Sequence, residues 1–306
     1  MFASHRTPAD CLPPPPQWKM ESRYLGYRDA DHLKPYAKYF QPETLPIQAH
    51  VRDALMAGMS PTEYGYPLAE AARRMEAPGY LKLETGWTRL DDGTSLVCVL
   101  TKMPGVTADM WDWWMAWHSV ETPRYKLWYP DAHQFVAWAD DRSADRSLTN
   151  RQRYVDNVSF VDEYIGGAMT RLSIHFIDKA RLGFSERPGH TVICGYGSMP
   201  AAPIGIGRIF HQVRPTEDGC EMRSRFFLGG PLEIHDFPAS IYENKLAAGL
   251  LGFKPVQPLL RPVLERVASR NLPPQFQTDM LFHCASEMNH LATFLPQLYA
   301  EFKDMP

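Results

Sequence analysis

The chain has 306 residues, of which 44% are hydrophobic and 22% are charged. These values are typical of a globular protein and exclude a disordered chain, a coiled coil or a collagen-like rod. The formal net charge of −3 gives no reason to expect a nucleic acid or an anionic membrane as partner. Five scattered cysteines without a CxxC pair, and an N-terminus without a continuous apolar stretch, favour a reduced, cytoplasmic protein without a secretory signal.

The N-terminal part of the chain predicts an extended lead followed by short helices. Residues 1–22 are rich in proline, which is typical of a polyproline-like or disordered segment. Residues 23–80 show helical patterns that prolines interrupt. Within them, Ser60 is placed to cap a helix that Pro61 opens and that Pro78-Gly79 ends.

A hairpin and an aromatic helix follow. The Asp92-Gly93 pair lies between alternating apolar stretches and predicts a β-hairpin turn. Residues 107–122, TADMWDWWMAWHSVET, predict a helix that begins near Thr107. For the next stretch, RYKLWYPDAHQFVAW (124–138), we expect an extended and irregular conformation.

The second half predicts strands and then helices. Residues 190–199, 205–214 and 220–230 have the pattern of strands, the last two joined by a tight turn from Thr216 to Gly219. Residues 239–268 predict a helical region, and a long C-terminal helix follows Pro273-Pro274. This order of elements predicts an α+β fold in which the C-terminal helix packs against an antiparallel sheet.

The C-terminal helix carries the clearest candidate for chemistry. At 100° per residue a single stripe contains Phe276, Met280, His283, Glu287, Leu291, Phe294 and Leu298. A stripe of this composition should face the core, and a buried carboxylate is costly unless it is paired or binds a metal. The pair His283 and Glu287 therefore predicts either a hydrogen bond within the core or two ligands of a metal.

Two ligands cannot hold a catalytic metal, so others must lie elsewhere. His133 follows a turn fixed by Pro130, and Glu163 precedes a Gly-Gly break that permits close backbone approach. His118 ends the aromatic helix, and His211 lies within a predicted strand. Two imidazoles with two carboxylates would neutralise Zn²⁺, but the residues alone do not decide between these candidates.

Four segments together resemble a known family. WDWWMAWHSVETPRYKLWYPDAH (111–133), VDEYIGG (161–167), GCEMRSRFFLGG (219–230) and LFHCASEMNHL (281–291) are similar to diacetylphloroglucinol hydrolases and phloretin hydrolases. The resemblance runs from about residue 60 to the C-terminus. It implies a helix-grip (Bet v 1-like) catalytic domain over residues 81–306, preceded by a helical region over 23–80 and the lead over 1–22.

The resemblance also implies a site. One zinc ion per chain would be held by His133, Glu163, His283 and Glu287, and Tyr125 and His211 would be catalytic side chains. For substrate binding we expect Tyr125, Val136, Trp117 and His118. Some family members carry a polar residue at the position of Val136, so the valine implies a more apolar surrounding for the acyl chain.

The implied reaction is hydrolysis of the carbon–carbon bond between a phloroglucinol-type ring and its acyl group, with release of a carboxylic acid. Two other classes stay open. One is a non-catalytic helix-grip carrier of an aromatic ligand, and the other is a related metalloenzyme, a lyase or a non-haem iron protein. We expect a small phenolic ketone as the partner, neither nucleic acid nor membrane, and the sequence leaves a homodimer open.

Overall fold

The computed structural model describes residues 23–198, 200, 204–234, 242, 244–255, 257–259 and 275–305. The predicted proline-rich lead, residues 1–22, lies outside these residues. The strands are β1 (Gly86–Arg89), β2 (Ser95–Pro104), β3 (His133–Trp138), β4 (Val158–Ile165), β5 (Ala168–Ile177), β6 (Thr191–Ser198), β7 (Ile204–Thr216) and β8 (Gly219–Ile234). The α-helices are α1 (Ala49–Ala57), α2 (Ala71–Glu76), α3 (Ala108–His118), α4 (Thr122–Trp128), α5 (Asn150–Tyr154), α6 (Lys245–Gly252), α8 (Phe276–Ala292) and α9 (Leu295–Phe302). The short 3-10 helices are η3 (Asp29–Leu33), η4 (Ala37–Tyr39), η5 (Thr62–Tyr64), η6 (Leu68–Glu70) and η7 (Lys179–Leu182).

The strands form one sheet in the order β1-β2-β8-β7-β6-β5-β4-β3, with every neighbouring pair antiparallel. The predicted α+β class is confirmed. The predicted hairpin turn lies between β1 and β2, where Gly93 has φ 87°, a conformation that glycine adopts without steric cost. The predicted turn from Thr216 to Gly219 joins β7 and β8.

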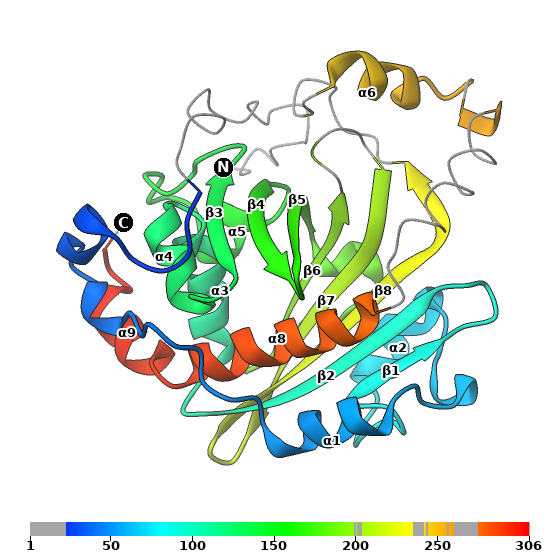
Figure 1. The fold of residues 1–306 in the computed structure, drawn as a ribbon, viewed down its shortest axis with the longest axis horizontal. Helices are drawn as coiled ribbons and strands as arrows, with labels where there is room; N and C mark the ends of the chain where they lie inside the picture. Colours follow the sequence, from blue (N-terminus) through cyan, green and yellow to red (C-terminus); the bar gives the residue numbers. More distant parts are fainter. Residues whose placement is uncertain are drawn as a thin grey trace.

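The sheet has two buried faces, which we call the inner and the outer face. Helix α8 crosses the inner face (Figure 1), and its buried side chains join residues such as Val99 and Val213 in the larger hydrophobic core. On the outer face Met75 of α2 packs with Leu96, Phe210 and other residues in a second cluster. Because successive side chains of a strand alternate between faces, strands β2, β6, β7 and β8 supply residues to both cores.

The start of α3 agrees with the prediction, whereas the C-terminal helix is interrupted. The Thr107 side chain accepts a hydrogen bond from the Met110 amide and caps α3, as predicted. The predicted long C-terminal helix is instead two helices, α8 and α9, with the break at Thr293 and Phe294. Pro296 lies in the first turn of α9, where its missing N–H costs nothing.

For the middle of the chain one prediction is wrong and one hairpin was missed. The stretch 124–138 is regular, since it contains most of α4 and all of β3. The hairpin of β4 and β5 was not predicted. Seven of the eight residues of β4 are buried, so both faces of the strand are covered. The alternation of polar and apolar residues that marks a half-exposed strand is therefore absent.

The predicted helix start at Ser60 is also wrong. Only the short η5 follows, without a side-chain cap, and the Ser60 amide donates instead to the Trp87 carbonyl at 2.8 Å. Helix α2 begins only at Ala71, and it ends before Pro78-Gly79 as predicted. Of the predicted helical region 239–268, α6 is confirmed, while much of the remainder lies outside the described residues.

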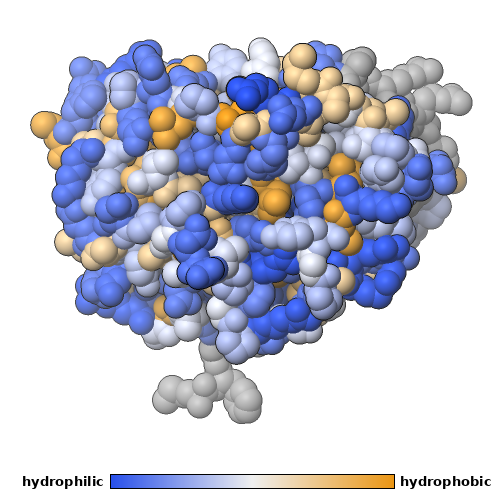
Figure 2. Space-filling view, turned by 90° about the horizontal axis from the view of Figure 1, so that it is seen from below, coloured by the Kyte–Doolittle hydropathy of each residue, from blue (hydrophilic) through white to orange (hydrophobic). Residues whose placement is uncertain are grey.

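One face of the molecule, the one at the bottom of Figure 1, is mostly hydrophilic, with hydrophobic residues in small separate groups (Figure 2). Among the residues that the structure describes, no helix combines the length and the apolar character that crossing a membrane would require.

Candidate metal centre

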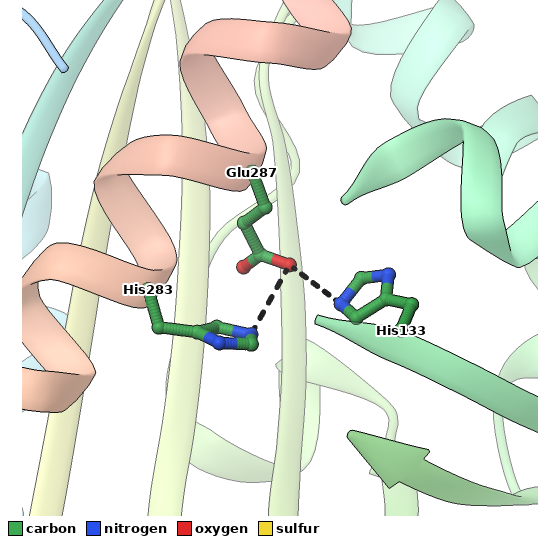
Figure 3. Close-up of side chains that lie close together, drawn as sticks. All are labelled: His133, His283 and Glu287. Carbon is green, nitrogen blue, oxygen red and sulfur yellow. Dashed lines mark ion pairs between the residues drawn. The ribbon is translucent and has the colours of Figure 1, made fainter. Parts of the chain in front are cut away.

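Three side chains that are far apart in the sequence converge under α8. Each of His133, His283 and Glu287 offers a ligand atom, and these atoms lie within 4.8 Å of one another. Figure 3 shows His283 and Glu287 projecting from α8 toward His133, which comes from the start of β3. All three side chains are buried. Histidine nitrogens and a carboxylate oxygen are the donor set that Zn²⁺ and similar cations bind in proteins.

Local structure fixes where these side chains point. The amides of Ala132 and His133 both donate to the Tyr129 carbonyl, a turn that ends α4 and delivers His133 into β3. His283 and Glu287 are four residues apart on α8, so they lie on the same helix face. A register shift between His133 and Phe135 then returns β3 to regular pairing with β4.

Both imidazoles are oriented by backbone carbonyls. The Nδ1 of His133 donates to the Tyr125 carbonyl at 3.1 Å, and the Nδ1 of His283 donates to the Tyr164 carbonyl at 2.9 Å. With Nδ1 protonated, each Nε2 presents its lone pair to the centre. Within the described part of the chain, Nε2 of His133 is buried and has no hydrogen-bond partner. Metal-binding histidines are typically held in this way, so the residues fit a cation.

Glu163 of β4 is the fourth acidic or imidazole group at this point. It lies opposite His133 in the sheet register. Its Oε2 is 3.6 Å from Nε2 of His133, and its Oε1 is 3.9 Å from Nε2 of His283. The Oε2 of Glu287 lies 3.6 and 3.9 Å from the same two nitrogens. Two carboxylates thus flank the pair of imidazoles that the resemblance had singled out.

The electrostatics of these groups favour a cation. Burial, followed by the nearby charge of Glu163, raises the pKa of Glu287 well above its ordinary value. Burial lowers the pKa of His133 well below its ordinary value, and His283 adds to that effect. Burial also lowers the pKa of His283. The imidazoles are therefore neutral at pH 7, and the raised pKa of Glu287 disfavours its charged form. A divalent cation would stabilise that charged form.

Tyr125 supports this cluster from α4. Its ring stacks on the His133 ring with centroids 3.7 Å apart and planes 4° apart, and its hydroxyl donates to Oε2 of Glu163. Burial and then the charge of Glu163 raise the pKa of Tyr125 well above 10. The phenol is therefore protonated at neutral pH and holds the carboxylate in place, while a direct role in catalysis stays a prediction.

Two of the predicted substrate contacts, His118 and Trp117, have partners within the protein, and the His118 ring stacks on Tyr125 with centroids 5.8 Å apart. Nδ1 of His118 donates to the Trp114 carbonyl at 2.7 Å, and Nε2 accepts from the Ser119 hydroxyl at 3.0 Å. Both ring nitrogens are thus bonded within the protein. The Trp117 ring packs against Tyr36 and Phe302, at 5.2 and 6.0 Å, on the side of the N-terminal region and α9. A role of either residue in substrate binding stays a prediction.

His211 and Val136 lie on the inner face. Nδ1 of His211 is 2.8 Å from the hydroxyl oxygen of Ser224 on β8, and its ring packs edge-on against Phe226. Burial lowers the pKa of His211 to about 4 although part of the side chain stays accessible. Val136 is buried in the inner core, and its amide donates to the Thr122 hydroxyl at 3.3 Å.

Two aromatic residues beside the histidines were missed. Trp128 lies edge-on to His133 at 5.7 Å between ring centroids, and Tyr129 lies 5.0 Å from His283. Had residues 122–128 been recognised as helical, the spacing of Tyr125 and Trp128 would have placed both rings on one helix face. The irregular conformation expected for this segment hid that signal.

Comparisons with known proteins agree with this geometry. The family described as DAPG hydrolase PhiG domain matches residues 66–300. The chain is 30% identical to a 2,4-diacetylphloroglucinol hydrolase of Pseudomonas protegens, over 92% of this chain and 89% of that protein. It is 26% identical to a phloretin hydrolase of Eubacterium ramulus, over 92% of this chain and 94% of that protein. The family match spans all the side chains that converge under α8, and the chain belongs to the DAPG hydrolase PhiG domain family.

Proposed function

We propose that this protein is a zinc-dependent hydrolase that cleaves the carbon–carbon bond between a phloroglucinol-type ring and its acyl group. The observation that carries the proposal is the convergence of His133, His283 and Glu287, with Glu163 beside them, in a chain of this hydrolase family. The names of the relatives, diacetylphloroglucinol hydrolase and phloretin hydrolase, support an acylated polyphenol as the substrate class.

The proposed architecture follows the same family. We assign residues 81–306 to a helix-grip catalytic domain and residues 23–80 to a helical N-terminal region. The sheet that α8 crosses supports this assignment, because in a helix-grip fold a long C-terminal helix lies along a curved antiparallel sheet.

Zinc would be held by the two Nε2 atoms of His133 and His283 and by the carboxylates of Glu287 and Glu163. A bound zinc ion would polarise a carbonyl oxygen or lower the pKa of a water toward about 7. The donor set also accepts iron, so metal identity is a matter for direct measurement.

The proposed reaction consumes one water. The ring carbon that bears the acyl group takes a proton, and the oxygen of the water bonds to the acyl carbon. The carbon–carbon bond then breaks, the acyl group leaves as a carboxylic acid, and the bonding electrons stay with the ring. Ring hydroxyls are required, because they allow the ring to adopt the keto tautomer in which that bond resembles one of a β-dicarbonyl compound. The released ring keeps its electrons as a stabilised enolate and returns to the phenol.

The residues of the chain would orient the ring and move protons. His211 is neutral at pH 7 because burial lowers its pKa to about 4, so its free Nε2 can bond a ring hydroxyl. Tyr125 donates to Glu163 and keeps that carboxylate turned toward the histidines. Val136 and Trp128 supply apolar surface near His133.

Two measurements test this function. Metal analysis of the purified protein should find close to one equivalent of zinc per chain. A substrate panel should show turnover of a monoacyl or diacyl trihydroxybenzene and none of acetophenone, since a site that bonds substrate hydroxyls rejects analogues that lack them. Equal rates with and without ring hydroxyls would contradict the proposed chemistry, and metal-free protein that binds acylphenols without turnover would favour a carrier.

A further inference from the structure

The segment over residues 23–48, which we call the N-terminal segment, contacts the elements that hold the metal centre. It precedes the part of the chain that the family matches, residues 66–300. In Figure 1 it is the blue trace that passes α4 and α9 and then runs beside α8 to α1. Its contacts fall on three places, namely β3 with β4, α4 and α8.

The first contact is made by Arg23. Its Nε donates to Oδ2 of Asp162 at 2.6 Å, and its guanidinium lies 3.8 Å from the centroid of the Phe135 ring. Asp162 is buried and directly precedes Glu163 in β4, while Phe135 lies two residues after His133 in β3. Arg23 therefore ties together the two strands that carry these ligand candidates, from the side opposite to the centre.

The second set of contacts holds α4. The Tyr27 hydroxyl donates to the Pro123 carbonyl at 2.6 Å, and the Tyr36 hydroxyl donates to Glu121, the residue that precedes the helix, at 2.6 Å. A helix of seven residues is not stable by itself, so it depends on such tertiary contacts. Helix α4 carries Tyr125, whose carbonyl and hydroxyl bond His133 and Glu163.

The third set reaches α8 and the turn before β3. The Leu45 amide donates to Nδ1 of His290 at 3.3 Å, one turn beyond Glu287. The Thr44 hydroxyl donates to Asp131 at 2.6 Å, two residues before His133. Each element that supplies a ligand candidate is thus bonded, directly or through a sequence neighbour, to the N-terminal segment.

We infer that the N-terminal segment is a positioning element of the metal centre, with Arg23 as the residue that sets the relative placement of His133 and Glu163. The inference rests on the proposed function, since it treats the centre as a metal site. Partners outside the ligand shell orient the ligands, and changing them typically weakens metal binding about 10–100-fold. Arg23 lies outside that shell and acts on the ligand candidates through its contacts with β3 and β4.

The test compares Arg23→Ala with a matched control, Arg73→Ala, in the full chain. Arg73 also bonds a carboxylate at 2.6 Å, that of Glu70, but on the exposed surface of α2. In both cases the carboxylate keeps a second arginine, Arg171 for Asp162 and Arg74 for Glu70. The two variants differ in whether the lost pair adjoins the centre and also in burial, since Asp162 is buried whereas the Arg73 pair is exposed.

Arg23→Ala should weaken zinc binding about tenfold in a chelator competition and raise amide hydrogen exchange in residues 133–138 and 158–165. Arg73→Ala should change neither. Arg23→Lys should restore part of the zinc affinity, because it keeps the charge but not the planar contact with Phe135.

Unchanged zinc affinity and unchanged exchange in Arg23→Ala would overturn the inference. The exchange measurement needs neither turnover nor metal, so it separates two kinds of failure. If the wild type hydrolyses no acylphenol, the proposed function fails while the comparison of the two arginine variants still decides the positioning role. A loss of thermal stability equal in both variants, without a difference in exchange, would also overturn the inference.

Discussion

Two clusters of buried ionisable side chains lie on opposite faces of the same sheet and differ in how their charges are balanced. On the outer face Glu84 accepts hydrogen bonds from Arg223 at 2.7 and 3.0 Å and from Arg225. Burial alone would raise the pKa of Glu84, but the hydrogen bonds from Arg223 and the charge of Arg225 outweigh it and the pKa is lowered. On the inner face burial dominates, and the pKa of Glu287 is raised well above its usual range.

The difference distinguishes a cluster whose carboxylate is paired within the protein from a candidate metal site. In the outer cluster two guanidinium groups of the protein bond the carboxylate of Glu84, so this carboxylate needs no further cation. The inner cluster combines neutral imidazoles with carboxylates that repel each other, and a divalent cation is the partner that would satisfy both. Perturbed ionisable groups that the protein itself leaves uncompensated are a physical sign of a binding or catalytic site.

The largest expected effect comes from removing a ligand on the inner face. His283→Ala should reduce bound metal to well below one equivalent and lower acylphenol hydrolysis more than about 100-fold, beyond the range for changes to outer partners. Metal analysis by mass spectrometry and a rate assay measure both quantities. Full metal retention would mean that His283 is a structural histidine.

The matching change on the outer face should act on stability and leave the metal in place. Glu84→Gln leaves two buried guanidinium groups, of Arg223 and Arg225, without their carboxylate. Breaking one partner of a buried pair costs about 3 kcal/mol, which urea denaturation would record as a lower midpoint. Zinc content close to that of the wild type is the expected control result.

The same variant has a defined pH dependence. Because the folded-state pKa of Glu84 is lowered, its contribution to stability is present above the unfolded pKa near 4.5 and is lost as pH falls through the folded value. The stability difference between the wild type and Glu84→Gln should therefore shrink in acid. A difference that is independent of pH would show that packing, and not the carboxylate charge, stabilises this face.

A third variant tests whether a buried group on the inner face marks a metal site by its position alone or only when its polar atoms lack partners. His118 lies on the inner side, yet both of its ring nitrogens are bonded, and burial lowers its pKa to about 3. A lowered histidine pKa means that stability falls as pH drops below the unfolded value of about 6.5. Between pH 6.5 and 5 the loss from this residue is about 2 kcal/mol.

His118→Gln should remove that part of the acid dependence and keep the zinc content. Denaturation curves of both proteins at pH 7 and pH 5 measure it, because the other histidines are common to both. If the two proteins lose the same stability between these values, His118 is not buried in its neutral form.

The sequence predicted those parts of the molecule whose signals are local. The stripe on α8 placed His283 and Glu287 together, the Asp92-Gly93 turn gave the first hairpin, and Thr107 gave the start of α3. Each signal depends on residues within about one turn of helix or one tight loop. The four ligand candidates themselves were assembled from a family resemblance and could not be derived from spacing.

The missed parts depend on partners that are distant in the chain. Helix α4 has seven residues and is held by Tyr27 and Tyr36, which lie about 90 residues earlier. Strand β4 tolerates Asp162 in a buried position because Arg23, 139 residues away, bonds it. The outer cluster likewise joins Glu84 to Arg223 over 139 residues. No periodicity within a short window encodes such pairs.

The smallest and most specific test uses β8, whose successive side chains face the two sides of the sheet. Arg223 and Arg225 face the outer cluster, and Ser224 between them faces the inner side, where its hydroxyl bonds Nδ1 of His211. Ser224 is fully buried and its hydroxyl also lies beside Cys284 of α8. If His211 contacts the substrate as proposed, a change at Ser224 should act on the reaction through His211. Ser224→Ala removes one hydrogen bond, which contributes about 1 kcal/mol, or roughly a fivefold change in a rate.

We expect Ser224→Ala to lower kcat about fivefold with zinc content unchanged and with a smaller effect on KM. The decisive measurement is a double-mutant cycle with His211→Phe. If Ser224 acts by orienting His211, the serine change should have almost no further effect on kcat once His211 is gone. Equal effects of Ser224→Ala in both backgrounds would mean that the hydroxyl only supports packing of β8. Catalysis on the inner face would then depend on the ligand candidates and not on the Ser224–His211 pair.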